Sequence, residues 1–224
     1  HRRAMLGNWA VAGREEDAIT PLEGLKAALG DKTRLIVAKG ADIDSQETTG
    51  FADAVAAAKQ ADAVVMLLGE HPDMSAEANN RTSLDLPGVQ EQLALAVAAT
   101  GKPVALVLLN GRPLSIGRLK GKVPAILEAW FPGVEGGPAI ADVLFGDVNP
   151  SAKLPVTFPH NVGQVPIYYA HKNTGRPPSE QEKYTSKYLD VPWTPLYAFG
   201  HGLSYTTFRY DAPVVSKKTL VPSA

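Results

Sequence analysis

The chain has 224 residues and a formal net charge of −1 at pH 7, from 22 Lys and Arg against 23 Asp and Glu. This balance provides no basic surface field that would attract nucleic acid. The sequence contains no cysteine, so disulfides, thiolate nucleophiles and cysteine metal ligands are excluded. Its longest apolar runs fall far short of the roughly 20 residues that cross a bilayer, so we expect no membrane span.

Along the chain, continuous apolar runs typical of buried strands alternate with stretches of helical periodicity. In chain order, the predicted elements are helix Pro21–Leu29 with Thr20 as its N-cap, strand Thr33–Ala38, helix Phe51–Gln60, strand Ala63–Leu68, helix Gly88–Ala99, strand Val104–Leu109, strand Val123–Ala129, helix Pro138–Phe145 and edge strand Leu154–Phe158. This alternation predicts an α/β sandwich: a mostly parallel, doubly wound sheet with helices on both faces. Ligands approach such a sheet at the carboxyl ends of its strands, so functional residues are expected in those loops.

Changes in composition predict three regions. Residues 1–158 form the α/β-sandwich domain, and residues 159–205 are rich in Pro, Tyr, Asn and Lys without periodicity, which is typical of a segment that wraps another domain. Residues 206–224 alternate β-type side chains, like the first strand of a β-sandwich (fibronectin III-like) domain. Because no strand is predicted before the first helix, we expect a domain that is truncated at both ends.

The loop from Gly69 to Pro87 follows a predicted buried strand and is the chemically richest segment. It carries two glutamates, a histidine and an arginine, namely Glu70, Glu77, His71 and Arg81. A carboxylic acid can protonate a leaving group where a partly apolar site raises its pKa, and a nearby arginine can hold the loop or tune that carboxyl. On composition alone, the alternative is a solvated loop without chemistry.

Motifs spread over nearly the whole chain resemble one enzyme family. In order, they are Glu77–Thr82 (EANNRT), Leu84–Pro87 (LDLP), Gly101–Val104 (GKPV), Leu109–Leu114 (LNGRPL), Trp130–Gly137 (WFPGVEGG), Ala141–Pro150 (ADVLFGDVNP), Ser151–Pro159 (SAKLPVTFP), Asn173–Pro177 (NTGRP), Lys183–Tyr188 (KYTSKY) and Phe199–Thr206 (FGHGLSYT). Together they resemble glycoside hydrolase family 3, in its branch of bacterial periplasmic β-glucosidases. The resemblance implies a periplasmic or secreted protein that needs no cofactor.

In that family a (β/α)8 barrel supplies an aspartate nucleophile, and the following α/β sandwich supplies an acid/base glutamate. The match to Glu-x-x-x-Arg-Thr places the acid/base on Glu77, with Glu70 as the runner-up. Arg81 would support the loop by charge-assisted hydrogen bonds, and His71 would pack within it. The implied reaction is double displacement with retention on a β-glucoside or oligosaccharide. Since nothing in the chain resembles the nucleophile-bearing strand, the isolated chain is expected to be nearly inactive.

Other residues allow a functional and a structural interpretation. Trp130 could stack on a sugar or belong to the core, and Arg112 follows a tight Asn-Gly turn but could face the barrel domain. The histidines are too dispersed for a metal site, so no metal is expected. A non-catalytic α/β ligand-binding or scaffold domain remains the alternative function, and the resemblance leaves room for a homodimer.

Overall fold

The computed structural model describes residues 1–217 and 219, and these contain a three-stranded parallel sheet. The strands are β1 (Val64–Gly69), β2 (Val104–Leu109) and β3 (Ala125–Glu128), in the spatial order β1-β2-β3. The register aligns Gly69 with Leu109 and Leu108 with Glu128, so the three strands end at the same edge of the sheet.

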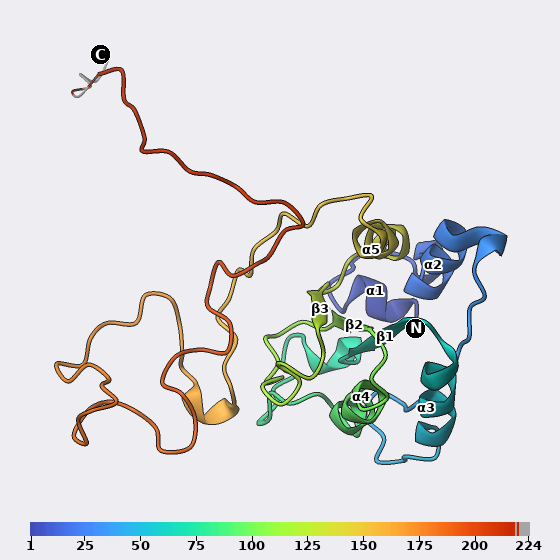
Figure 1. The fold of residues 1–224 in the computed structure, drawn as a ribbon, viewed down its shortest axis with the longest axis horizontal. Helices are drawn as coiled ribbons and strands as arrows, with labels where there is room; N and C mark the ends of the chain where they lie inside the picture. The colour runs from blue at the N-terminus through green and yellow to red at the C-terminus, as the bar shows by residue number, and fades with distance from the viewer. Residues whose placement is uncertain (218, 220–224) are drawn as a thin grey trace.

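Helices cover both faces of this sheet (Figure 1). On one side lie α1 (Arg3–Leu6), α2 (Pro21–Leu29) and α5 (Gly136–Phe145). On the other side lie α3 (Phe51–Gln60) and α4 (Gln90–Ala98). Short 3-10 helices span Glu15–Asp17, Gly30–Lys32, Pro72–Met74 and Val162–Gln164. The predicted α/β architecture, a parallel sheet between two helical layers, is confirmed.

The core follows from the alternation of side chains along the central strand. In β2, Leu106 and Leu108 are fully buried in the cluster shared with α4, whereas Val107 is buried in the cluster shared with α1 and α5. A strand whose side chains are buried on both faces needs a continuous apolar sequence, because successive residues point to opposite sides. The run VALVLL therefore marks the centre of the sandwich.

The packing of α2 against α5 depends on two glycines. A Cβ on Gly24 would lie 2.3 Å from the backbone of Gly137, so the two helices meet backbone to backbone. At the start of α2, Thr20 accepts a hydrogen bond from the N–H of Glu23, and the Glu23 carboxylate accepts one from the N–H of Thr20. This capping box confirms the predicted N-cap.

Two predicted strands are wrong. Residues 33–38 run without secondary structure, and Leu35 and Val37 are 37% and 62% exposed, because no strand of the described chain pairs with them. In the predicted edge strand Leu154–Phe158, the only bridge in the described chain joins Phe158 to Tyr197. The Pro155 nitrogen carries no hydrogen to donate, which prevents a regular ladder there.

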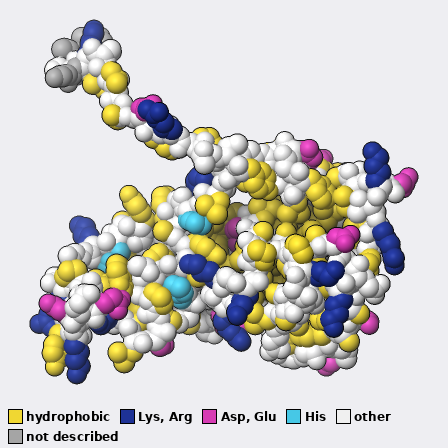
Figure 2. Space-filling model, viewed as in Figure 1, with side chains coloured by type: hydrophobic (Ala, Val, Ile, Leu, Met, Phe, Trp, Pro, Cys, Tyr) yellow, Lys and Arg dark blue, Asp and Glu magenta, His cyan; other side chains and the backbone are white. Residues whose placement is uncertain are grey.

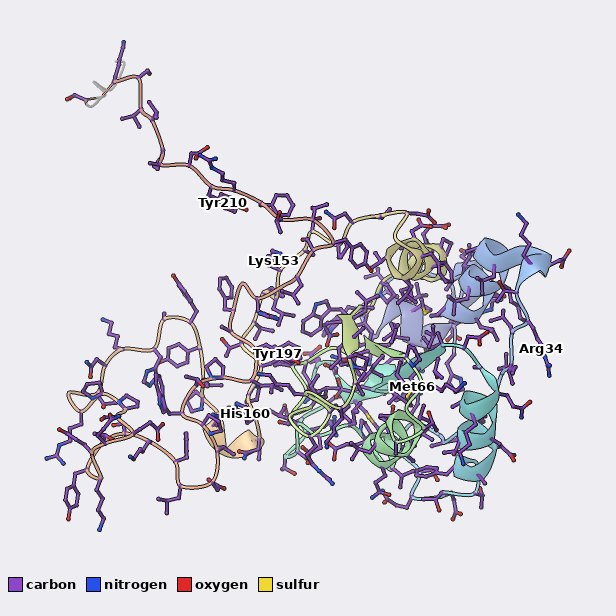
Figure 3. All side chains as sticks on the ribbon, viewed as in Figure 1. Arg34, Met66, Lys153, His160, Tyr197 and Tyr210 are labelled. Carbon is purple, nitrogen blue, oxygen red and sulfur yellow. The ribbon has the colours of Figure 1, made fainter. Side chains whose placement is uncertain are left out.

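Residues 159–195 leave the sandwich and return to it at the same place. Phe158 N–H donates to Tyr197 O and Leu154 N–H donates to His201 O, both at 2.8 Å. Figure 3 shows Tyr197 and His160 at this border, while Met66 lies within the layers. We call these main-chain hydrogen bonds the return contact. The three predicted regions remain a prediction, and the last one, 206–224, extends at 218 and 220–224 outside the described residues.

Apolar surface gathers in Figure 2 over the helical layer of α1, α2 and α5. In β1, Val65 and Leu67 are exposed, on the face of the sheet opposite the buried Met66 and Leu68. None of the helices in the described part of the chain combines the length and the apolar character that crossing a bilayer requires.

Candidate active site

The loops that follow the three strands meet at one edge of the sheet. Glu70 N–H donates to Leu109 O at 2.9 Å, and Ala129 N–H donates to Leu108 O at 2.9 Å. Gly111 N–H, in the loop after β2, donates to Glu70 Oε2 at 3.1 Å. The edge where ligands were expected is therefore a single continuous surface built from three loops.

Glu70 lies at the centre of this edge, and its side chain has no exposed area. Arg81 Nη1 donates to Glu70 Oε1 at 2.6 Å. Arg112 Nε lies 3.0 Å from the same oxygen, an ion-pair contact whose N–H direction misses hydrogen-bond geometry. Both guanidinium side chains are only 18% exposed. We call these three residues the glutamate–arginine cluster.

The arginines of this cluster also bind the main chain of the 70–87 loop. Arg112 Nη2 donates to the carbonyl oxygens of Met74 and Asn79, the latter at 3.1 Å. Arg81 Nη2 donates to Asp85 O at 2.9 Å. Such contacts are those expected of loop support by Arg81, a role that nonetheless stays a prediction.

Glu77 lies on the same loop, between the two carbonyls that Arg112 holds, and its side chain is exposed. The next residue, Ala78, has a positive φ of 60°, a left-handed conformation that L residues other than Asn and Asp rarely adopt. A backbone held in this conformation needs support from its surroundings, and such positions gather at functional sites.

An open pocket of about 490 Å³ lies beside the loop. Its lining is aromatic and small polar: Trp9, Ser75, Ala76, Asn110, Gly111, Trp130 and Phe131. The ring centroid of Trp130 is 5.9 Å from that of the buried Phe158, so Trp130 contacts the core and lines the pocket at once. Contact of Trp130 with the core is therefore observed, and its stacking on a sugar stays a prediction.

Glu128, at the end of β3, is a second, partly buried carboxyl at this edge, and it is not among the site residues that the sequence predicts. The pKa of Glu128 is raised to about 8, chiefly by burial and to a smaller extent by the nearby Glu70, while hydrogen bonding from the Trp130 N–H and the Asn110 side chain acts in the opposite direction. Its Oε2 and the Asn110 Oδ1 are both buried without a hydrogen-bond partner among the described residues. The signal available in the sequence is one acidic residue inside the apolar run AILEAW.

His71 packs at the start of the loop and connects it to the N-terminal segment. Its Nδ1 accepts a hydrogen bond from Asp73 N–H at 3.3 Å and caps the 3-10 helix Pro72–Met74. Asp73 in turn pairs with Arg3 at 2.6 Å. His71 therefore has a structural setting rather than a place in the pocket. Within residues 1–217 and 219, no group of three His, Asp or Glu side chains could hold a metal ion.

Comparisons with known proteins agree on one family. Residues 1–205 match the model of the glycosyl hydrolase family 3 C-terminal domain. The chain is 46% identical to a periplasmic beta-glucosidase of Salmonella typhimurium, over 98% of this chain and 32% of that protein. It is 44% identical to a beta-xylosidase of Formosa agariphila, over 90% of this chain and 27% of that protein.

Among solved structures, a beta-glucosidase from Listeria innocua superimposes with a TM-score of 0.85 at 41% identity, over 92% of this chain and 28% of that one. The chain thus spans about a third of the length of the relatives that it matches.

Proposed function

Because the chain belongs to glycosyl hydrolase family 3, as its C-terminal domain, we propose that it supplies the general acid/base of a retaining β-glucosidase, and that Glu77 is that residue. The observation that carries this proposal is the placement of an exposed carboxyl on a loop that two partly buried arginines hold beside an aromatic pocket. A proton donor must reach a leaving group in a substrate that arrives from outside the domain, and Glu77 is accessible for this.

Accessibility also favours Glu77 over Glu70. The Glu70 carboxylate is fully buried, and its oxygens are engaged by Arg81, Arg112 and the Gly111 N–H. Reaching a glycosidic oxygen would require breaking these contacts and leaving two partly buried cations without their partner, which is costly. Glu70 is therefore better suited to holding the site together than to exchanging protons with a substrate.

In the proposed reaction, an aspartate of a (β/α)8 barrel elsewhere in the protein attacks the anomeric carbon of a terminal β-D-glucosyl residue. Glu77 donates its proton to the departing glycosidic oxygen and, as a carboxylate, then takes a proton from the water that releases the sugar. The two carboxyl groups must stand about 5–5.5 Å apart, so docking of the two domains sets the catalytic distance. The reaction needs no cofactor.

The aromatic pocket is suited to the sugar next to the scissile bond. The faces of Trp9 and Trp130 offer apolar surface to the C–H side of a pyranose ring. The matched relatives include a beta-glucosidase and a beta-xylosidase, so the substrate class is a β-linked glycoside. By the same similarity, we propose that the whole protein works in the periplasm or outside the cell.

The test is Glu77→Ala in the full-length enzyme, with Glu47→Ala, an exposed glutamate outside the 70–87 loop, as the matched control. Loss of the proton donor should lower kcat/KM for cellobiose by on the order of 10²–10⁴-fold. Azide should restore turnover of a dinitrophenyl glucoside and yield β-glucosyl azide. Near-normal activity of the variant would show that Glu77 is not the acid/base.

A further inference from the structure

We propose that Glu70 is the positioning residue of the acid/base: through its two arginines it fixes the loop backbone on either side of Glu77. This inference rests on the proposed function of Glu77, and it goes beyond it by assigning a role to the buried carboxylate that the chemistry does not use. Its basis is a series of contacts that leads from the sheet to the loop.

The first step is the anchoring of Glu70 to the sheet. It is the first residue after β1, and its N–H bonds to Leu109 O of β2. The buried Gln90 side chain holds the preceding residue from α4, donating to Gly69 O at 2.7 Å and accepting from Gly69 N–H at 2.8 Å. Glu70 therefore continues directly from the hydrogen-bonded sheet.

The second step is electrostatic. A buried carboxylate is strongly unfavourable unless charged or hydrogen-bonding partners replace its water. For Glu70 these partners are Arg81 Nη1 at 2.6 Å and Arg112 Nε at 3.0 Å from Oε1, and the Gly111 N–H at 3.1 Å from Oε2. Conversely, the arginines are held at this edge because the carboxylate lies between them. Removing the negative charge would leave two mostly buried cations repelling each other.

The third step is the contact between the arginines and the loop. Arg112 holds the carbonyls of Met74 and Asn79, and Arg81 holds that of Asp85. Between residues 74 and 85 the loop has no helix or strand, so these side-chain contacts take the place of secondary structure. The carbonyls of Met74 and Asn79 lie on either side of Glu77, three residues before it and two residues after it.

A residue that places the acid, but is not the acid, leaves a particular kinetic pattern. Its loss should displace Glu77 without removing it, and a displacement of about 1 Å can reduce a rate by about 10²-fold. The reduction should be concentrated on substrates whose leaving group needs protonation. Attack on a glucoside with a leaving group that departs as an anion depends much less on the acid.

The experiment compares Glu70→Gln with wild type in the full-length enzyme on cellobiose and on dinitrophenyl β-glucoside. Glutamine keeps the shape and can still accept from the Gly111 N–H, but it lacks the charge that holds the arginines. We expect kcat/KM to fall about 10–100-fold on cellobiose and less than about 3-fold on the activated substrate. Azide should give no rescue, because Glu77 remains in place.

The matched control is Glu91→Gln. It removes the ion pair in which Arg118 Nη1 lies 2.7 Å from Glu91 Oε1, and neither of these residues lines the pocket. It should show no dependence on the leaving group. Equal losses on both substrates in Glu70→Gln, or a lowered Tm with unchanged kinetics, would overturn the inference. If Glu70→Gln does not fold, Arg112→Lys decides, because a lysine cannot hold two carbonyls and a carboxylate with one planar group.

The two proposals fail in different ways. If Glu77→Ala shows azide rescue while Glu70→Gln shows no leaving-group dependence, only the positioning role is wrong. If Glu70→Ala is rescued by azide and Glu77→Ala is fully active, Glu70 itself is the acid/base, and both proposals are wrong.

Discussion

Two glutamates, the buried Glu70 and the partly buried Glu128, lie at the same edge of the sheet in different electrostatic surroundings. Glu70 has two guanidinium groups in contact with one oxygen, whereas Glu128 accepts a hydrogen bond from the Trp130 N–H at 3.2 Å and has Glu70 as a like-charged neighbour. Burial without a cation disfavours the charged form of a carboxyl. Glu128 therefore keeps its proton at neutral pH in the folded chain, where its pKa is about 8.

This difference predicts a pH dependence of stability. Between the unfolded pKa of 4.5 and the folded value of about 8, the native state binds a proton at Glu128 that the unfolded state has lost. The free energy of unfolding should therefore fall as pH rises through this window, by up to about 1.4 kcal/mol per pH unit from this group. Urea unfolding of wild type and Glu128→Gln at pH 5 to 8 measures it, and the variant should show the shallower decline.

The exposed Glu135 provides the control for that measurement, since Glu135→Gln should leave the wild-type slope unchanged. Parallel slopes for wild type and Glu128→Gln would contradict the prediction.

The residues of the site differ in how visible they are in the sequence. The 70–87 loop, with Glu77 and Arg81, is marked by its position after a buried strand and by its motif. The burial of Glu70 and its contact with Arg112 depend on the parallel register of β1 and β2, which joins residues about 40 positions apart. Trp9 reaches the pocket from the N-terminal segment, and no local pattern indicates this.

At the scale of elements, the end of β1 leaves no room for a side chain against β2. Gly69 has a φ of +152°, and a Cβ there would lie 1.9 Å from Leu109 O. This atom belongs to the backbone of β2 and cannot move aside as a flexible side chain could. The origin of the 70–87 loop is thus fixed by a position that only glycine fits.

Gly69→Ala should therefore lower the free energy of unfolding by about 2–5 kcal/mol, combining backbone strain with overpacking. Gly101→Ala is the control, because Gly101 also has a positive φ, of 75°, but open space around it. It should cost only about 1–2 kcal/mol. Equal costs in urea unfolding would show that the contact with β2 does not matter.

The elements that the sequence predicts correctly are those whose partners lie within the chain. Helices α2, α3, α4 and α5 and strands β1, β2 and β3 follow from apolar periodicity and continuous apolar runs. Residues 33–38 have the same kind of sequence, but a strand also requires a neighbouring backbone, and none pairs with this segment in the described chain. Periodicity reports which side chains prefer burial, and it does not report whether a hydrogen-bonding neighbour is present.

At the scale of the whole molecule, the proposed mechanism divides the catalytic pair between two domains. Purified as these 224 residues, the chain should release no nitrophenol from an aryl β-glucoside, because the proposed nucleophile belongs to another part of the enzyme. Assaying the chain beside the full-length enzyme at equal molarity measures this. Turnover by the chain that disappears in its Glu77→Ala variant would show that both carboxyl groups lie within these residues.

The return contact has a consequence for how this domain can vary. Since residues 154–158 and 196–201 are already joined by main-chain hydrogen bonds, the ends of the intervening segment are fixed whatever its length. Doubling the length of such a segment raises the free energy of loop closure by only about 0.6 kcal/mol. Insertions and deletions between residues 158 and 196 can therefore reshape the outer surface of the molecule. The sheet edge that carries the 70–87 loop keeps its position.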